Sequence, residues 1–106
     1  MTSLNTSYSL ENNFTKDKFL NNKNKKILNS IFENPVRADI AWTDIEKLVK
    51  SLGGKVIQAR GSRTAFEING FINVFHRPHP KPDTNKLTVR DIRDFLERAG
   101  VTPDKE

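Results

Sequence analysis

Apolar side chains recur at helical spacing in three segments of this 106-residue chain. The first segment is KNKKILNSIFENP, where one helical face carries Ile27, Leu28, Ile31 and Phe32. Asn34-Pro35 predicts the end of that helix, because a helical conformation is disfavoured for the residue before a proline. Residues 1–22 are rich in Asn, Ser and Thr and show no sustained period, so we expect a flexible polar tail there.

The other two helical segments, WTDIEKLVKSLGG and TVRDIRDFLERAGV, carry signals at both ends. Each begins with a threonine followed three residues later by an acidic residue, which is the spacing of a capping box. These pairs are Thr43 with Glu46 and Thr88 with Asp91. Glycine ends both patterns, at Gly53-Gly54 and at Gly100, as expected for left-handed C-caps. The two apolar stripes consist of Ile45, Leu48, Val49 and Leu52, and of Val89, Ile92, Phe95, Leu96 and Ala99.

Three strand candidates lie between these two helices: KVIQAR, RTAFEI and FINVFH. Asn69-Gly70 joins the second to the third and favours a two-residue hairpin turn. Such a turn fixes the register, so that Ile68 pairs with Phe71, Phe66 with Asn73, and Thr64 with Phe75. That face is mostly large and apolar, and we expect it under the helices. The opposite face carries the pairs Glu67 with Ile72, Ala65 with Val74, and Arg63 with His76, and should be open to solvent or a ligand.

The order of elements is therefore helix, helix, three antiparallel strands, helix. It predicts an α+β fold, with a three-stranded antiparallel sheet and helices on one sheet face. We expect the flexible tail at 1–22, an N-terminal helix and connector at 23–41, and one small domain at 42–102.

The net charge of +5 is confined to one region of the chain. Between residues 55 and 93 the eight basic residues outnumber the three acidic ones by five, so the rest of the chain is neutral. This excess indicates a surface for a polyanion such as nucleic acid, although an ordinary solvated basic surface has the same pattern. The absence of cysteine excludes disulfides, zinc thiolate sites and a cysteine nucleophile. No signal peptide or membrane span is evident, so we expect a soluble, cytoplasmic protein that does not bind membranes.

Both histidines of the chain, His76 and His79, lie in the motif FHRPHP. The hairpin register places Arg63 beside His76, with Cβ atoms ~5 Å apart. A guanidinium suits a phosphate and a neutral imidazole can accept a proton, so the pair is either a phosphodiester site or a non-catalytic surface pair. A metal site is disfavoured, because the nearest carboxylate, Asp83, follows three prolines. No phosphate-binding loop or nucleophile-elbow motif is present.

The segment from Trp42 to Val101 resembles the HicA family of bacterial toxin–antitoxin toxins. Three features carry the resemblance: a helix ending in glycine before the first strand, Gly61-Ser62 before the second, and Ala99-Gly100-Val101 after the last helix. The family's usual signature is Gly-Ser-His with a catalytic histidine, whereas position 63 here is Arg. The resemblance implies a double-stranded-RNA-binding-like fold and a metal-independent, cofactor-free endoribonuclease that cleaves mRNA. It also implies a HicB-like antitoxin that blocks the site.

One branch of the family pairs Gly-Ser-Arg with a downstream His-Arg-Pro-His-Pro. On that resemblance we expect His76 to act as base on the ribose 2′-OH and Arg63 to stabilise phosphate charge. His79 is expected either to protonate the leaving oxygen or only to contact RNA. The residues expected to bind RNA are Arg60, Ser62, Arg77, Lys81, Lys86 and Arg90. A non-catalytic RNA-binding module and a protein–protein adaptor are the alternatives, while DNA binding is disfavoured by the acidic residues of the last helix.

Overall fold

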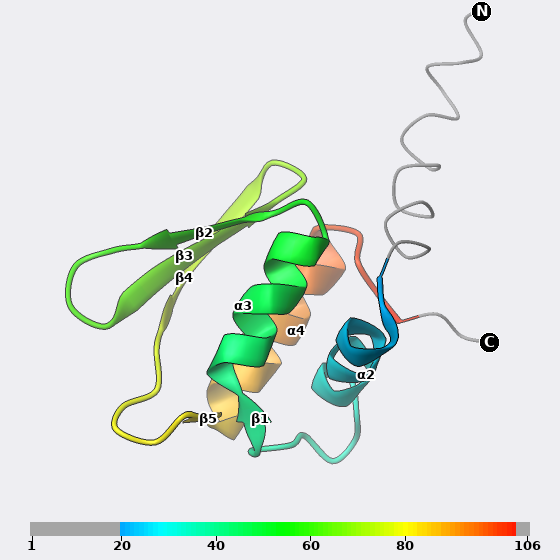
Figure 1. Ribbon diagram of the computed structural model, residues 1–106, viewed down its shortest axis with the longest axis horizontal. Coiled ribbons are helices and arrows are strands. Elements are labelled where there is room, and N and C mark those ends of the chain that lie inside the picture. The colour runs from blue at the N-terminus through cyan, green and yellow to red at the C-terminus, as the bar shows by residue number, and fades with distance from the viewer. Residues whose placement is uncertain (1–19, 104–106) are drawn as a thin grey trace, which may run out of the picture.

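The computed structural model describes residues 20–103, which contain three helices, a three-stranded sheet and a separate pair of short strands (Figure 1). In chain order the elements are α2 (Asn22–Ile31), β1 (Ile40–Ala41), α3 (Trp42–Ser51), β2 (Lys55–Gln58), β3 (Arg63–Ile68), β4 (Phe71–His76), β5 (Asp83–Thr84) and α4 (Lys86–Arg98). The predicted α+β class is confirmed, and the arrangement is compatible with a double-stranded-RNA-binding-like fold.

The main sheet has the strand order β2-β3-β4 and is antiparallel throughout. Asn69 and Gly70 both have positive φ, 53° and 86°, as a two-residue primed turn requires. The hairpin register is the predicted one, from Ile68 opposite Phe71 to Arg63 opposite His76. The first strand is shorter than expected, since it ends at Gln58 rather than continuing to Arg60.

Helices α3 and α4 cover one face of this sheet, and the core lies between the two layers (Figure 1). Phe66 is fully buried there, stacked on Trp42 and in contact with Phe75, which in turn meets Phe95 edge-on. The predicted apolar stripes of both helices supply the rest of this core. The opposite sheet face has no helix over it within residues 20–103, as the alternation predicted (Figure 1).

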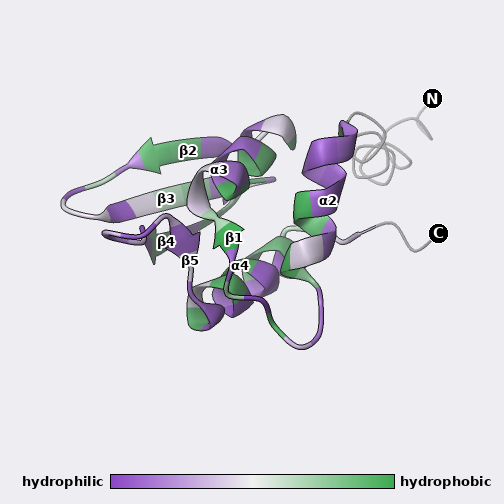
Figure 2. Cartoon of the chain, turned by 60° about the horizontal axis from the view of Figure 1, so that its bottom comes forward, coloured by the Kyte–Doolittle hydropathy of each residue, from purple (hydrophilic) through white to green (hydrophobic). Residues whose placement is uncertain are grey.

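Helix α2 forms a third layer, on the side of α3 and α4 away from the sheet (Figure 1). Its first half is hydrophilic, and its apolar residues lie in the second half, where Leu28 and Ile31 are buried (Figure 2). Leu20 is buried as well, and the Asn21 side chain caps the helix by accepting from the N–H of Asn24. These last residues of the expected tail are thus part of the fold, whereas positions 1–19 lie outside the described residues.

Both predicted capping boxes are wrong. Helix α3 begins at Trp42, before Thr43, because the strand β1 leads directly into it and Trp42 N–H donates to the Pro82 carbonyl at 2.9 Å. The Glu46 carboxylate instead accepts from the indole Nε1 of Trp42 at 2.8 Å.

Helix α4 begins at Lys86, two residues before the expected cap. Asn85 is its N-cap and accepts from the N–H of Thr88 at 2.8 Å. Asparagine is at least as good a cap as threonine, and it stands three residues earlier. The hydroxyl of Thr88 and the carboxylate of Asp91 therefore have no capping role.

Candidate functional site

The proline-rich loop that follows β4 is anchored at both ends. At its start, Arg77 donates its backbone N–H to the Ser62 carbonyl at 2.6 Å and a guanidinium N–H to the Gly61 carbonyl at 2.9 Å. At its end, β5 pairs with β1, which places Thr84 opposite Ile40. The loop therefore spans from the open end of the β3–β4 hairpin to the first residues of α3 and α4.

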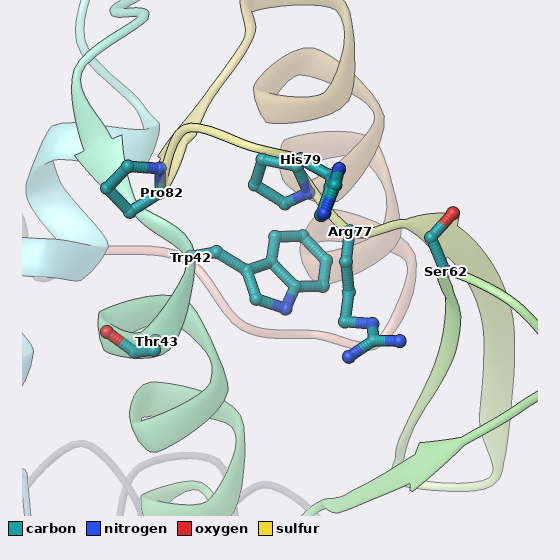
Figure 3. Close-up of a pocket in the computed structure, with 7 residues that line it drawn as sticks. Trp42, Thr43, Ser62, Arg77, His79 and Pro82 are labelled. Atoms are coloured by element: carbon teal, nitrogen blue, oxygen red, sulfur yellow. The ribbon is translucent and has the colours of Figure 1, made fainter.

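One hollow lies between this loop and the start of α3, and we call it the aromatic hollow. It has a volume of about 240 Å³. Figure 3 shows the Trp42 indole beside the Arg77 side chain, with Pro82 and Ser62 on opposite sides. The full lining consists of Trp42, Thr43, Ser62, Arg77, Pro78, His79 and Pro82.

A second hollow, which we call the histidine hollow, lies at the N-terminus of α4 and has a volume of about 180 Å³. Both histidines line it, with Arg77, Pro78, Thr84, Asn85 and Thr88. Within the described part of the chain, the first turn of α4 has no acidic residue, so the positive end of the helix is not neutralised there. Thr84 is only 1% exposed, and its hydroxyl has no hydrogen-bond partner in residues 20–103. Polar groups and a helix N-terminus of this kind suit an anion such as phosphate.

A family model, the HicA toxin of bacterial toxin–antitoxin systems, matches residues 42–101, more than half of the chain. This chain belongs to the HicA toxin family. Searches of curated proteins and of solved structures gave no significant match. The matched segment runs from α3 to the end of α4, so both hollows of this HicA chain lie inside the family domain, while α2 lies outside it.

Three residues were expected to do chemistry. His76 and His79 are brought together in the histidine hollow, and both are exposed. Arg63 stands opposite His76 in the strand register and is exposed, but it lines neither of these two hollows. His76 thus stands opposite Arg63 in the strand pair and shares the histidine hollow with His79.

The expected RNA-binding residues divide into two groups. Ser62 and Arg77 line the aromatic hollow, and Arg77 also holds the loop against Gly61. The Nε of Arg77 is buried and has no hydrogen-bond partner within the described residues. Because Arg77 lines both hollows, this N–H is an unpaired donor beside them. The other four are exposed and line neither hollow: Arg60, Lys81, Lys86 and Arg90.

One basic residue of the central excess lies away from the site. Arg93 donates to the Ile31 carbonyl at 2.9 Å, to the Glu33 carbonyl at 2.6 Å and to the Asn34 side chain at 3.2 Å. Arg93 therefore joins α4 to the C-terminal end of α2, and its guanidinium donates hydrogen bonds within the fold rather than facing the two hollows.

Sequence reasoning missed the residues that close the two hollows: Trp42, Thr43, Thr84, Asn85 and Thr88. They are assembled by the pairing of β1 with β5, and a two-residue strand is too short for its alternation to be recognised. Among the described residues there is no group of three or more His, Cys, Asp or Glu side chains that could hold a metal ion. Nor does that part of the chain include a helix of the length and apolar character that crossing a membrane requires.

Proposed function

We propose that this HicA toxin is an endoribonuclease that cleaves mRNA without a metal ion, and that the histidine hollow is its active site. The observation that carries the proposal is that the only two histidines of the chain line one polar hollow at the N-terminus of α4. Two imidazoles near one phosphate can serve as the base and the acid of a proton-transfer reaction. The cytoplasm, where mRNA is found, is the proposed site of action.

The proposed reaction begins when His76 removes the proton of a ribose 2′-OH. The 2′-oxygen then attacks the adjacent phosphorus, which forms a 2′,3′-cyclic phosphate and breaks the bond to the 5′-oxygen of the next nucleotide. His79 supplies the proton that this leaving oxygen takes. The N-terminus of α4 and the guanidinium of Arg63 would stabilise the negative charge that builds on the phosphate.

The exposed cations around the hollows suit the flanking phosphates of a single strand. Arg60 lies in the turn before β3 and Arg63 at the start of β3, while Lys81 lies in the proline-rich loop and Lys86 at the start of α4. Contacts of this kind fix the position of the strand without reading its sequence. The proposed second partner is a HicB-like antitoxin, since a HicA toxin has an antitoxin partner.

The test is cleavage of a single-stranded RNA in EDTA by the wild-type chain and by His76→Ala, His79→Ala and Arg63→Ala. We expect a cyclic-phosphate product from the wild type, and a fall in rate of about 100-fold or more for His76→Ala, because a general base contributes at least that factor. The matched control is Lys47→Ala, which changes an exposed cation on α3 outside both hollows and should leave the rate unchanged.

A His76→Ala chain that cleaves at the wild-type rate would refute the assignment. Salt-sensitive RNA binding without any product would instead support the alternative, a non-catalytic RNA-binding module. An oligonucleotide with 2′-deoxyribose at the cleaved position is the substrate control: it can bind but cannot form the cyclic phosphate, so any product from it would contradict attack by the 2′-oxygen.

A further inference from the structure

The open face of the sheet carries large apolar side chains that nothing within residues 20–103 covers. Ile72 is 61% exposed, Val74 is 52% exposed and Ile57 is 43% exposed. In the strand register Ile57, Ala65 and Val74 stand side by side across all three strands, and Ile72 stands one step further along β4. These four residues form one surface, which we call the open-face patch.

Charge is distributed unevenly around the open-face patch. On one side Lys55 stands opposite Glu67, so the two charges offset each other. On the other side Arg63 stands opposite His76, and the exposed Arg60 lies in the preceding turn. The patch therefore joins an apolar centre to a basic border, and that border contains residues of the proposed active site.

We propose that the open-face patch is the docking surface of the antitoxin, and that the antitoxin places apolar side chains on the patch and a carboxylate beside Arg63. Such a partner would cover the apolar centre and reach the active-site border in one interface. The inference rests on the toxin–antitoxin part of the proposed function and does not depend on RNA cleavage.

The chemistry of the patch favours a protein partner over RNA. Aliphatic side chains offer neither a ring for a base to stack on nor a donor for a phosphate, whereas buried apolar anchors are typical centres of protein interfaces. A second copy of this chain is disfavoured because its net charge is also +5 and the two basic borders would repel each other. An acidic antitoxin surface would instead be complementary to the border.

The test compares two substitutions in the patch, Ile72→Lys and Val74→Lys, with Leu87→Lys. Leu87 is a matched control, since it is also a large apolar residue, 69% exposed, but lies on α4 outside the patch. Each full-length chain is co-expressed with the protein encoded by the adjacent reading frame, purified through a tag, and its affinity for that protein is measured. We expect the wild type and Leu87→Lys to bind alike, and each patch variant to bind at least about tenfold more weakly.

The second readout is growth. We expect the patch variants to arrest growth even when the adjacent protein is present, because they remain toxic and are no longer neutralised. RNA cleavage by each variant is assayed separately, so that failure of the nuclease proposal would not affect the binding result.

Three results would overturn the proposal. One is unchanged affinity of both patch variants, or no complex with the wild-type chain. Another is a dimer of the isolated wild-type chain that the patch variants convert to monomer, which would assign the patch to a second copy. The third is weaker binding of a 2′-deoxy oligonucleotide with unchanged affinity for the adjacent protein, which would assign the patch to nucleic acid.

Discussion

Replacing Arg93 with methionine tests whether α2 is an integral part of this fold. Methionine is unbranched and apolar, so it replaces the methylene stem of Arg93, but it has none of the hydrogen-bond donors of the guanidinium. Two bonds to backbone carbonyls and one to the Asn34 side chain are lost, together with a guanidinium placed 5.7 Å from the centre of the Phe32 ring. Hydrogen bonds of charged groups contribute ~1.5–3 kcal/mol each when buried. Because this site is partly exposed, we expect a total loss of about 2 kcal/mol in the free energy of unfolding.

The assay is thermal and urea unfolding of the full chain. For a domain of this size, a loss of that magnitude lowers Tm by about 10 °C. Arg90→Met is the matched control, since Arg90 lies on the same helix, is exposed and forms no hydrogen bond or ion pair within residues 20–103. Its effect should stay within about 0.5 kcal/mol. Equal unfolding midpoints for the two variants would refute the role given to Arg93.

Two further predictions concern single sites. Gly54→Ala should destabilise the chain by about 1–3 kcal/mol in thermal unfolding, because a Cβ there would lie 2.6 Å from the Glu67 carbonyl oxygen. The side-chain hydrogen bonds and the charge of Arg37 lower the pKa of Asp39. The stability that Asp39 contributes is therefore present above its unfolded pKa and lost as pH falls through the lower folded value. Titration by NMR should give Asp39 a lower midpoint than in Arg37→Ala, and equal midpoints would contradict this.

The central hairpin could be predicted from the sequence because few local choices determine it. Asn69-Gly70 permits positive φ at two consecutive residues, and a two-residue turn leaves one register for the strands that it joins. The alternation of Phe66 and Ile68 with smaller or polar neighbours then decides which face is buried. The observed pairing of Arg63 with His76 follows from these two constraints alone.

The helix starts could not be predicted in the same way, since several nearby residues compete for each cap. The choice at α4 depends on where β5 ends, and the choice at α3 depends on the bond between Trp42 and Pro82. Both are set by the pairing of β1 with β5, which joins residues far apart in the sequence. The same pairing completes the two hollows, so the sequence indicated the histidines, Ser62 and Arg77 but not Trp42, Thr43, Thr84, Asn85 and Thr88.

The two histidines of FHRPHP occupy one hollow but are held by different means. His76 is fixed by β4 and its pairing with β3, whereas His79 depends on a loop that Arg77 attaches to Gly61 and Ser62. Position 63, which the resemblance places at the histidine of the Gly-Ser-His signature, stands opposite His76 in this strand pair. In the proposed reaction, an imidazole on β4 does the work that the resemblance assigns to an imidazole on β3. The arginine at position 63 then supplies positive charge across the same pair of strands.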